Sequence, residues 1–338
     1  MERRDFLKTT VGAGMALVGV NLISCQNAGG NATNYNPKGL PTILFGSTGV
    51  RIPRIVLGLG SRFCHMDSDQ EAYDMLNFAL DNGLYYFDTA HNYDNSIALP
   101  PWKEKPTRLI NSEERVGEVV KTRRKEIFLS TKISARDASD AMRKIELSLK
   151  RLHTDRLDML KIHGVDTMED VNRMSEKGNM IDFMIRMKEE KVTRFIGFST
   201  HLDNESTKEL LNRGPFDSML IAMNHYSPRQ QALGLAWPTV KDKKMGLLLM
   251  KAVRPKETIA GLKATDLVRY ALSLDGPDAL ALGMDGVDIV KSNVDLLKNF
   301  QKMDSDKMRL LTQQLAPFYR HENLPWMQKG YCDGHWSS

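Results

Sequence analysis

The feature of this chain that most constrains its fold is a regular alternation of strand-like and helix-like segments. Short apolar runs, typical of buried strands, are separated by longer stretches in which apolar residues recur at helical spacing. Such alternation favours parallel strands that are each followed by a helix, and it predicts one α/β domain, a (β/α)8 TIM barrel. Helices are expected at 68–81, 112–123, 135–152, 170–190, 204–212, 264–274 and 291–301, and strands at 85–87, 127–129, 157–162, 194–198, 219–223, 246–250 and 279–283, with a weak pattern at 229–242.

Four polar residues stand at or just after the ends of these strands: Asp88, Tyr93, Lys132 and His163. In a TIM barrel the C-terminal ends of all strands open onto one face, so residues that are distant in sequence converge there. We therefore expect these four side chains to form one active site. Taken singly, each has an ordinary structural interpretation, such as a buried ion pair between Asp88 and Lys132. Their joint placement at strand ends favours catalysis.

The chemistry that such a group suits is the interconversion of a carbonyl and an alcohol. A phenol such as Tyr93 has an ordinary pKa of about 10, too high for ready proton exchange near neutral pH. An ammonium from Lys132 favours the phenolate, and Asp88 holds that lysine charged and in place. His163 can donate a hydrogen bond to the substrate oxygen. Because no side chain carries a hydride, a bound cofactor must supply it.

The residues around these positions resemble the motifs of the aldo-keto reductase family, in the family's order. The matching segments are 44–53, 55–60, 88–93, 130–132, 160–166 and 197–200, within a resemblance that runs from about residue 42 to residue 300. The resemblance implies an N-terminal β-hairpin before the barrel and an aldehyde, ketone or sugar as substrate. It also implies Asp88, Tyr93, Lys132 and His163 as the catalytic set. His91 and Asp166 belong to the same motifs, and each is either catalytic or merely structural.

The same resemblance implies NAD or NADP as cofactor and gives the positions that would hold it. These positions are Ser199, Thr200, Asn224, Lys251, Gly283, Met284 and Asn293. Many family members use basic residues for the 2′-phosphate of NADP, but 283–285 contains none, and Lys291 is the nearest cation in sequence. An acidic residue such as Asp285 near the ribose suits the hydroxyls of NAD, so a preference for NADP is not expected. The pair Ser112-Glu113 resembles the family's cofactor-side Ser-Glu and equally fits an ordinary helix start.

The N-terminus carries a separate pattern. The run 3–8 contains a twin-arginine motif, and the apolar stretch 11–23 that follows is short and glycine-rich for a membrane span. Residues 22–25 resemble the lipobox of bacterial lipoproteins, in which the cysteine, here Cys25, is acylated. The sequence thus predicts export to the periplasm and attachment to the membrane, with a plainly cleaved signal or an uncleaved anchor as alternatives. The expected division is a signal at 1–24, a flexible tether at 25–41, the barrel at 42–303 and a C-terminal tail at 304–338.

Charge and cysteine content exclude several other classes of function. The formal net charge is +5, without a basic cluster of the kind that binds nucleic acid. Of the three cysteines, Cys25 is assigned to lipid. Cys64 and Cys332 are too few for a zinc or an iron–sulfur site, although they could form a disulfide in an oxidising compartment. No metal site is expected.

Two other functions of the same fold stay open. One is a non-catalytic nucleotide- or carbohydrate-binding lipoprotein, because a fold does not fix a function. The other is a barrel lyase or isomerase that acts without nicotinamide. The segment 94–111, which includes Trp102, is longer than the family commonly has. It is expected either over the mouth of the site, where loops select substrates, or in solvent. The tail after Lys302 could reach the same face.

Overall fold

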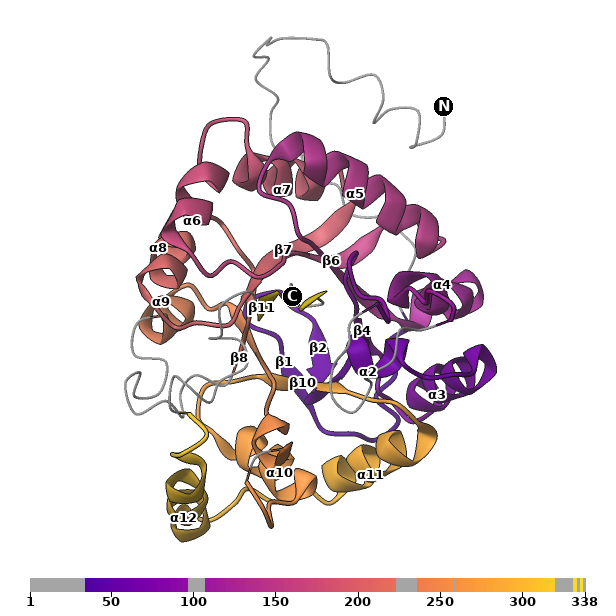
Figure 1. Ribbon diagram of the computed structural model, residues 1–338, viewed down its shortest axis with the longest axis vertical. Helices are drawn as coiled ribbons and strands as arrows, with labels where there is room; N and C mark the ends of the chain where they lie inside the picture. The colour runs from indigo at the N-terminus through magenta and orange to yellow at the C-terminus, as the bar shows by residue number, and fades with distance from the viewer. Residues whose placement is uncertain are drawn as a thin grey trace.

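Eight parallel strands close into a barrel, and this barrel positions the four candidate catalytic residues (Figure 1). The structure is a computed structural model that describes residues 34–96, 107–222, 236–257, 259–319, 331–332 and 335–336. Neighbouring strands follow the order β10-β3-β4-β5-β6-β7-β8-β9. Their bounds are β3 (Ile55–Gly58), β4 (Tyr86–Asp88), β5 (Phe128–Ile133), β6 (Leu157–Ile162), β7 (Thr193–Thr200), β8 (Ser218–Ala222), β9 (Gly246–Met250) and β10 (Ala279–Gly283). The predicted (β/α)8 barrel is confirmed, and β6, β9 and β10 have the predicted ends.

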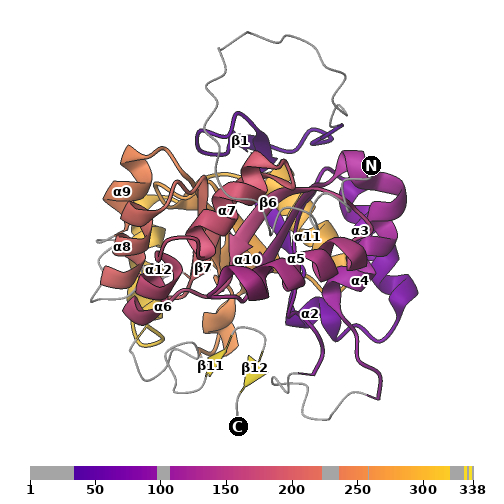
Figure 2. The same cartoon turned by 90° about the horizontal axis from the view of Figure 1, so that it is seen from above.

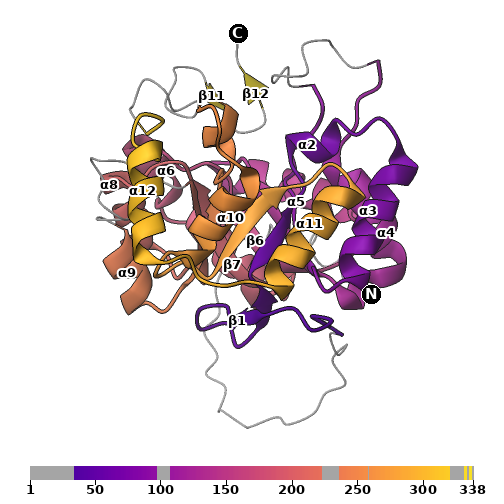
Figure 3. The ribbon, with the colours of Figure 1, turned by 90° about the horizontal axis from the view of Figure 1, so that it is seen from below.

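Helices surround the barrel, as expected for repeated βα units (Figures 1 and 3). They are α2 (Ser61–Cys64), α3 (Asp69–Asp81), α4 (Ser112–Arg123), α5 (Ala138–Arg151), α6 (Met168–Met174), α7 (Met180–Glu189), α8 (Glu205–Arg213), α9 (Trp237–Asp242), α10 (Ala264–Ser273), α11 (Val287–Lys298) and α12 (Ser305–Leu315), with 3-10 turns η2 (Arg124–Glu126) and η4 (Arg254–Glu257). Side-chain caps explain several starts: Ser68 Oγ accepts from Glu71 N at the start of α3, and Asn111 Oδ1 accepts from Glu113 N at the start of α4.

The structure corrects the predicted helix at 170–190, which is two helices, α6 and α7. At the break, the Ser175 hydroxyl donates to the carbonyl of Val171 at 2.6 Å, and Gly178 adopts a φ of +76°. This left-handed conformation interrupts a helix and is accessible to glycine at little cost. Apolar residues recur at helical spacing on both sides of the break, so the periodicity predicted one continuous helix. The helix α12, within the expected tail, was not predicted.

The N-terminal end of the barrel is closed by a hairpin of β1 (Thr42–Leu44) and β2 (Arg51–Pro53), at one end of the molecule in Figure 2. Phe45, next to β1, is fully buried and meets Tyr86 edge to face, with 6.1 Å between ring centroids. Gly246 makes room for the Phe45 ring, because a Cβ at residue 246 would lie 2.3 Å from that ring. The predicted N-terminal hairpin is therefore confirmed.

The chain approaches this hairpin along the same end of the barrel. The backbone N–H of Asn34 donates to the carbonyl of Lys125 at 2.8 Å. Tyr35 stacks on Tyr85 with 5.2 Å between centroids, and its hydroxyl donates to Asp158 Oδ1 at 2.6 Å. Burial, together with Asp158, raises the pKa of Tyr35. From Asn34 onward the predicted tether is thus held against the end of the barrel opposite the candidate site.

Two short strands of the tail, β11 (Tyr331–Cys332) and β12 (His335–Trp336), pair antiparallel at the other end of the barrel (Figures 2 and 3). The tail therefore reaches the C-terminal face. Cys64 is a free, buried thiol. Across the segments that the structure describes, no helix combines the length and apolar character needed to cross a membrane.

Candidate active site

The structure brings the four predicted catalytic residues together at the C-terminal end of the barrel. Asp88 is the last residue of β4, Lys132 lies within β5, and His163 directly follows β6. Lys132 Nζ is 2.7 Å from Asp88 Oδ2 and 4.6 Å from the centroid of the Tyr93 ring. The rings of Tyr93 and His163 meet edge to face with 5.4 Å between centroids. A phenol, an ammonium and an imidazole thus lie together at the C-terminal end of the barrel. Of the four residues, Tyr93 is partly exposed, and the other three are buried.

A second lysine, which the sequence motifs did not single out, shares Asp88. Lys161 Nζ lies 2.6 Å from Asp88 Oδ1 and 2.7 Å from Ser130 Oγ. The parallel register pairs Lys132 with Lys161, so both lysines reach one carboxylate from neighbouring strands. Burial alone would raise the pKa of Asp88, but the two lysines hold it well below its usual range. A signal existed in the sequence: Lys161 stands two residues before His163, so the two side chains point to the same face of a strand that is apolar apart from Lys161 and Asp158.

The loop that carries Tyr93 is braced by Ser112 at the start of α4. The backbone N–H of Ser112 donates to the carbonyl of Tyr93 at 2.9 Å. Its hydroxyl donates to the carbonyl of Leu59 at 2.5 Å and lies 2.7 Å from Thr89 Oγ1. The carbonyl of Thr89 in turn accepts from Lys132 Nζ at 2.8 Å. The helix start therefore ties the ends of two strands to the loop that presents the phenol.

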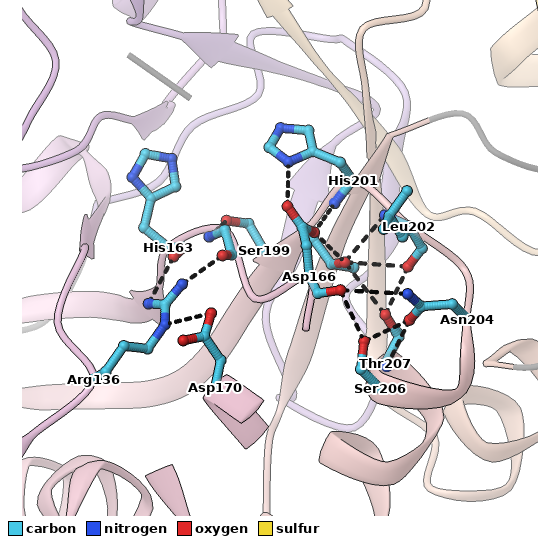
Figure 4. Close-up of polar contacts among 12 residues, drawn as sticks. Arg136, His163, Asp166, Asp170, Ser199, His201, Leu202, Asn204, Ser206 and Thr207 are labelled. Carbon is cyan, nitrogen blue, oxygen red and sulfur yellow. Dashed lines mark hydrogen bonds and ion pairs between the residues drawn. The ribbon is translucent and has the colours of Figure 1, made fainter. Parts of the chain in front are cut away.

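His163 is oriented by side chains that the sequence did not indicate. Its Nδ1 lies 2.9 Å from Asn92 Oδ1 and 3.2 Å from Ser134 Oγ. The guanidinium of Arg136 donates to the carbonyl of His163 at 3.1 Å, and its Nε pairs with Asp170 Oδ2 at 2.9 Å (Figure 4). Both the ring and the backbone of His163 are thereby held in place at the mouth of the barrel.

Asp166 organises the neighbouring loop after β7, as Figure 4 shows. Its carboxylate accepts from the backbone N–H of His201 at 2.7 Å and from Thr200 Oγ1 at 2.9 Å, and it pairs with His201 Nδ1 at 3.0 Å. Burial would raise the pKa of Asp166, but the hydrogen bonds from His201 and Thr200 lower it. Ser199 Oγ accepts from the backbone N–H of Gly164 at 3.0 Å. Ser199 and Thr200, both predicted cofactor residues, are thus bound to the loop that follows His163.

The other predicted cofactor positions fall in separate places. Asn224 lies outside the described residues. Lys251 directly follows β9 with a φ of +62°. Gly283 ends β10 and is exposed, whereas Met284 is fully buried and Asn293 nearly so within α11. The Met284 side chain is part of the hydrophobic core.

A cation nearer than Lys291 lies beside the loop after β10. Arg62 Nη1 is 3.0 Å from Asp285 Oδ2, and its Cδ would be 3.3 Å from a Cβ at Gly283. The helix α11 begins after Gly286 without a side-chain cap, and the space where a Cβ of Gly286 would lie is open. An uncapped helix N-terminus next to a guanidinium suits the phosphate groups of a nucleotide.

A second buried polar cluster lies behind β5, on the outer face of the barrel. Thr131 Oγ1 donates to Glu113 Oε1 at 2.6 Å, and Glu113 Oε2 is 3.8 Å from Arg151 Nη1. Burial raises the pKa of Glu113 to about 7. His91 Nδ1 lies 3.2 Å from Ser148 Oγ, and burial with the nearby Arg151 lowers the pKa of His91 to about 4. His91 and Glu113 therefore belong to a group that supports β5 from outside.

Comparison with known proteins identifies the family that this chain resembles. The sequence model of the Aldo/keto reductase family matches residues 54–253. An uncharacterized oxidoreductase of Bacillus subtilis, YqkF, is 28% identical over 187 residues, which are 52% of this chain and 54% of that protein. L-glyceraldehyde 3-phosphate reductase of Escherichia coli (strain K12) is 27% identical over 135 residues, 36% of each chain. The matched stretches thus span about half of the first relative and about a third of the second.

Solved structures share the fold over most of their length. The aldo-keto reductase AKR11C1 from Bacillus halodurans (holo form) is 20% identical, covers 82% of this chain and 96% of its own, and has a TM-score of 0.64. An aldo-keto reductase from Klebsiella pneumoniae in complex with NADPH is 18% identical, covers 81% and 94%, and also has a TM-score of 0.64. At these identities the likeness establishes the fold alone. The family match, however, covers more than half of the chain and includes all four clustered residues, so the chain belongs to the aldo/keto reductase family.

Proposed function

We propose that this protein is an NAD(P)-dependent oxidoreductase that interconverts a carbonyl and an alcohol on a small molecule. The observation that carries the proposal is the position of the Lys132 ammonium, between the Asp88 carboxylate and the Tyr93 ring. An ammonium beside a phenol favours the phenolate, as proton transfer near neutral pH requires. Family membership and relatives named as oxidoreductase or reductase support the same class of reaction. The substrate class is an aldehyde, a ketone or a sugar.

In the direction of reduction, Tyr93 donates its phenolic proton to the substrate oxygen. Lys132 stabilises the phenolate that remains, and Asp88 holds the lysine in place through the 2.7 Å ion pair. His163, whose ring meets that of Tyr93, orients the same oxygen through a hydrogen bond. In the direction of oxidation the phenolate of Tyr93 accepts the proton.

The residues at the end of β10 and the start of α11 fit a nucleotide cofactor. Its phosphates would be held by exposed Gly283, by the uncapped helix start after Gly286 and by the guanidinium of Arg62. By their family positions, Ser199, Thr200, Lys251 and Asn293 would also contribute to binding. When bound, a nicotinamide supplies the hydride. The neighbour solved with NADPH supports a nucleotide of this kind.

Because Asp285 offsets the charge of Arg62, we expect no strong preference for NADP over NAD. Titration of both nucleotides against the intrinsic fluorescence of the protein measures this preference. A preference for NADP greater than about tenfold, or ~1.4 kcal/mol, would contradict the expectation.

The substitution Tyr93→Phe tests the proton-transfer role directly. It removes one hydroxyl from a partly exposed ring, so we expect folding and nucleotide binding to be retained. Turnover of a carbonyl substrate should fall by about 10² to 10⁴, the usual contribution of a positioned acid or base. The measurement is steady-state kinetics on a panel of aldehydes, ketones and sugars. A variant with wild-type kcat on a substrate of the wild-type protein would exclude Tyr93 as the proton donor.

We also propose that the protein is exported and lipid-anchored through Cys25, as the twin-arginine and lipobox patterns predict. The position of Tyr35 is compatible with this, because the chain approaches the barrel at the end opposite the active site. An anchor at that end leaves the site accessible. The test is fractionation of cells that express the wild-type chain or Cys25→Ser. We expect the wild type in the membrane and the variant released, and equal release of both would rule out lipidation.

A further inference from the structure

The unusual feature of the site is that one buried carboxylate serves two buried lysines. Asp88 Oδ2 binds Lys132 at 2.7 Å, and Asp88 Oδ1 binds Lys161 at 2.6 Å. A single Asp–Lys pair would be electrically neutral as a whole. With both lysines protonated, the three groups instead carry one net positive charge inside the barrel.

The contacts of Lys161 match those of an ammonium. Its three acceptors are Asp88 Oδ1 at 2.6 Å, Ser130 Oγ at 2.7 Å and the Tyr86 hydroxyl at 3.2 Å. A protonated lysine has three N–H bonds, one for each of these acceptors. The Ser130 hydroxyl itself donates to Asp88 Oδ1 at 2.8 Å, so it is free to accept from the lysine. Lys161 Nζ also lies 5.4 Å from the centroid of the Tyr86 ring. Burial lowers the pKa of Lys161, and Asp88 opposes that effect.

The two lysines approach Asp88 on different oxygens, and only Lys132 contacts the phenol. Lys132 Nζ is 4.6 Å from the Tyr93 ring centroid, whereas Lys161 is directed to Ser130 and Tyr86 further inside the barrel. If Lys132 were the sole partner of Asp88, the negative carboxylate would cancel part of the positive field that the phenol experiences. A second cation on the other oxygen removes that cancellation.

We propose that Lys161 is a positioning residue of this site: it neutralises Asp88 from inside the barrel, so that the charge of Lys132 acts on Tyr93 without compensation. This inference rests on the proposed role of Tyr93. The charged and titratable groups around the cluster are Asp88 and Tyr86 from β4, Lys132 from β5, His163 at the mouth, and Asp158 of β6, whose charge acts on Tyr86. Glu113 lies behind β5 and acts on the cluster only through space.

The test measures ionisation of Tyr93 without any substrate. The chain has nine tyrosines, so the ultraviolet absorbance of tyrosinate is followed against pH and the titration of the matching Tyr93→Phe protein is subtracted. This difference titration is recorded in the wild-type background, in Lys161→Gln, which keeps a hydrogen-bond donor but no charge, and in Ser130→Ala. The last variant is the matched control, because it removes the hydrogen bonds of Ser130 with Asp88 Oδ1 and Lys161 Nζ but leaves every charge of the cluster in place.

We expect Lys161→Gln to raise the midpoint of Tyr93 ionisation by roughly one pH unit, the scale of a single buried charge nearby. Ser130→Ala should leave that midpoint within a few tenths of a unit. An unchanged or lowered midpoint in Lys161→Gln, or an equal rise in Ser130→Ala, would overturn the proposal. Because no turnover is measured, this result is independent of whether Tyr93→Phe abolishes activity, so the two proposals can fail separately.

A measurement on the unmodified protein covers the case in which Lys161→Gln does not fold. In nitrogen-15 spectra of side-chain-labelled lysine at neutral pH, the proposal requires two buried ammonium groups whose protons exchange slowly with water. A neutral amine at either buried position would remove the net charge and would overturn the proposal.

Discussion

Two buried carboxylates on opposite faces of β5 have pKa values shifted in opposite directions. Asp88 faces the barrel interior, where two lysines lie within 2.7 Å and hold its pKa well below the ordinary range. Glu113 lies behind the strand, where its nearest cation, Arg151, is 3.8 Å away and burial raises its pKa to about 7. Both side chains are almost completely removed from solvent.

The difference shows that burial alone does not decide the charge of a carboxylate in this protein. Burial disfavours the ionised form of both groups, and only Asp88 has enough close positive charge to reverse that preference. The alternation of side chains along β5 separates the two environments, since Ser130 and Lys132 point inward and Thr131 points outward. One face of β5 therefore lies against a carboxylate that is ionised at neutral pH, and the other face lies against a carboxylate that titrates near pH 7.

The sharpest way to break this comparison is to make the same change, carboxylate to amide, on the two faces. Asp88→Asn leaves Lys132 and Lys161 buried without a counter-charge. We expect a loss of about 3 to 5 kcal/mol in the free energy of unfolding at pH 7, the usual cost of removing one partner of a buried ion pair. Urea unfolding followed by circular dichroism measures it.

The loss in Asp88→Asn should also depend on pH. Without the carboxylate, the folded-state pKa of Lys161, which burial already lowers, falls further below its unfolded value, so the stability deficit grows as pH falls and shrinks toward pH 10. A deficit that stays the same between pH 7 and pH 10, or one below about 1 kcal/mol, would show that the cluster is not the charged, desolvated group described above.

The substitution Glu113→Gln is expected to raise the free energy of unfolding at pH 8, by less than Asp88→Asn lowers it at pH 7. The folded-state pKa of Glu113, about 7, lies above the ordinary value of 4.5, so the folded protein binds a proton more tightly than the unfolded chain between these values. The stability that Glu113 contributes is therefore present below about pH 4.5 and is lost as pH rises through 7. The amide mimics the protonated acid and does not titrate. The variant should match the wild type at pH 5 and exceed it by about 2 kcal/mol at pH 8.

The control for Glu113→Gln is its own pH series, because an effect on packing would change the free energy of unfolding equally at pH 5 and pH 8. Parallel stability curves for variant and wild type from pH 5 to pH 8 would contradict the raised pKa. A variant that is less stable than the wild type at pH 8 would mean that ionised Glu113 is held by a stronger partner than Arg151.

The sequence by itself determined the alternation of strands and helices, the closing of β3 to β10 into a barrel, and the gathering of Asp88, Tyr93, Lys132 and His163 at one end. These features depend on local periodicity and on the rule that parallel strands end on one face, both of which are visible along the chain. The same periodicity carried the predicted helix at 170–190 across the break between α6 and α7. There α6 ends at Met174, and Gly178 has a left-handed backbone conformation that the apolar pattern does not reveal.

Which charged groups form ion pairs with one another was decided only by the tertiary structure. Lys161 was visible as one of two charged residues in a largely apolar strand, but its partner follows from the register that aligns Lys132 with Lys161 and Asp88 with Ser130. The pairing of Arg62 with Asp285 likewise joins residues that are distant in sequence. Protonation states depend on distances between strands and on the water excluded between them, and neither quantity is encoded in the spacing of residues along a single strand.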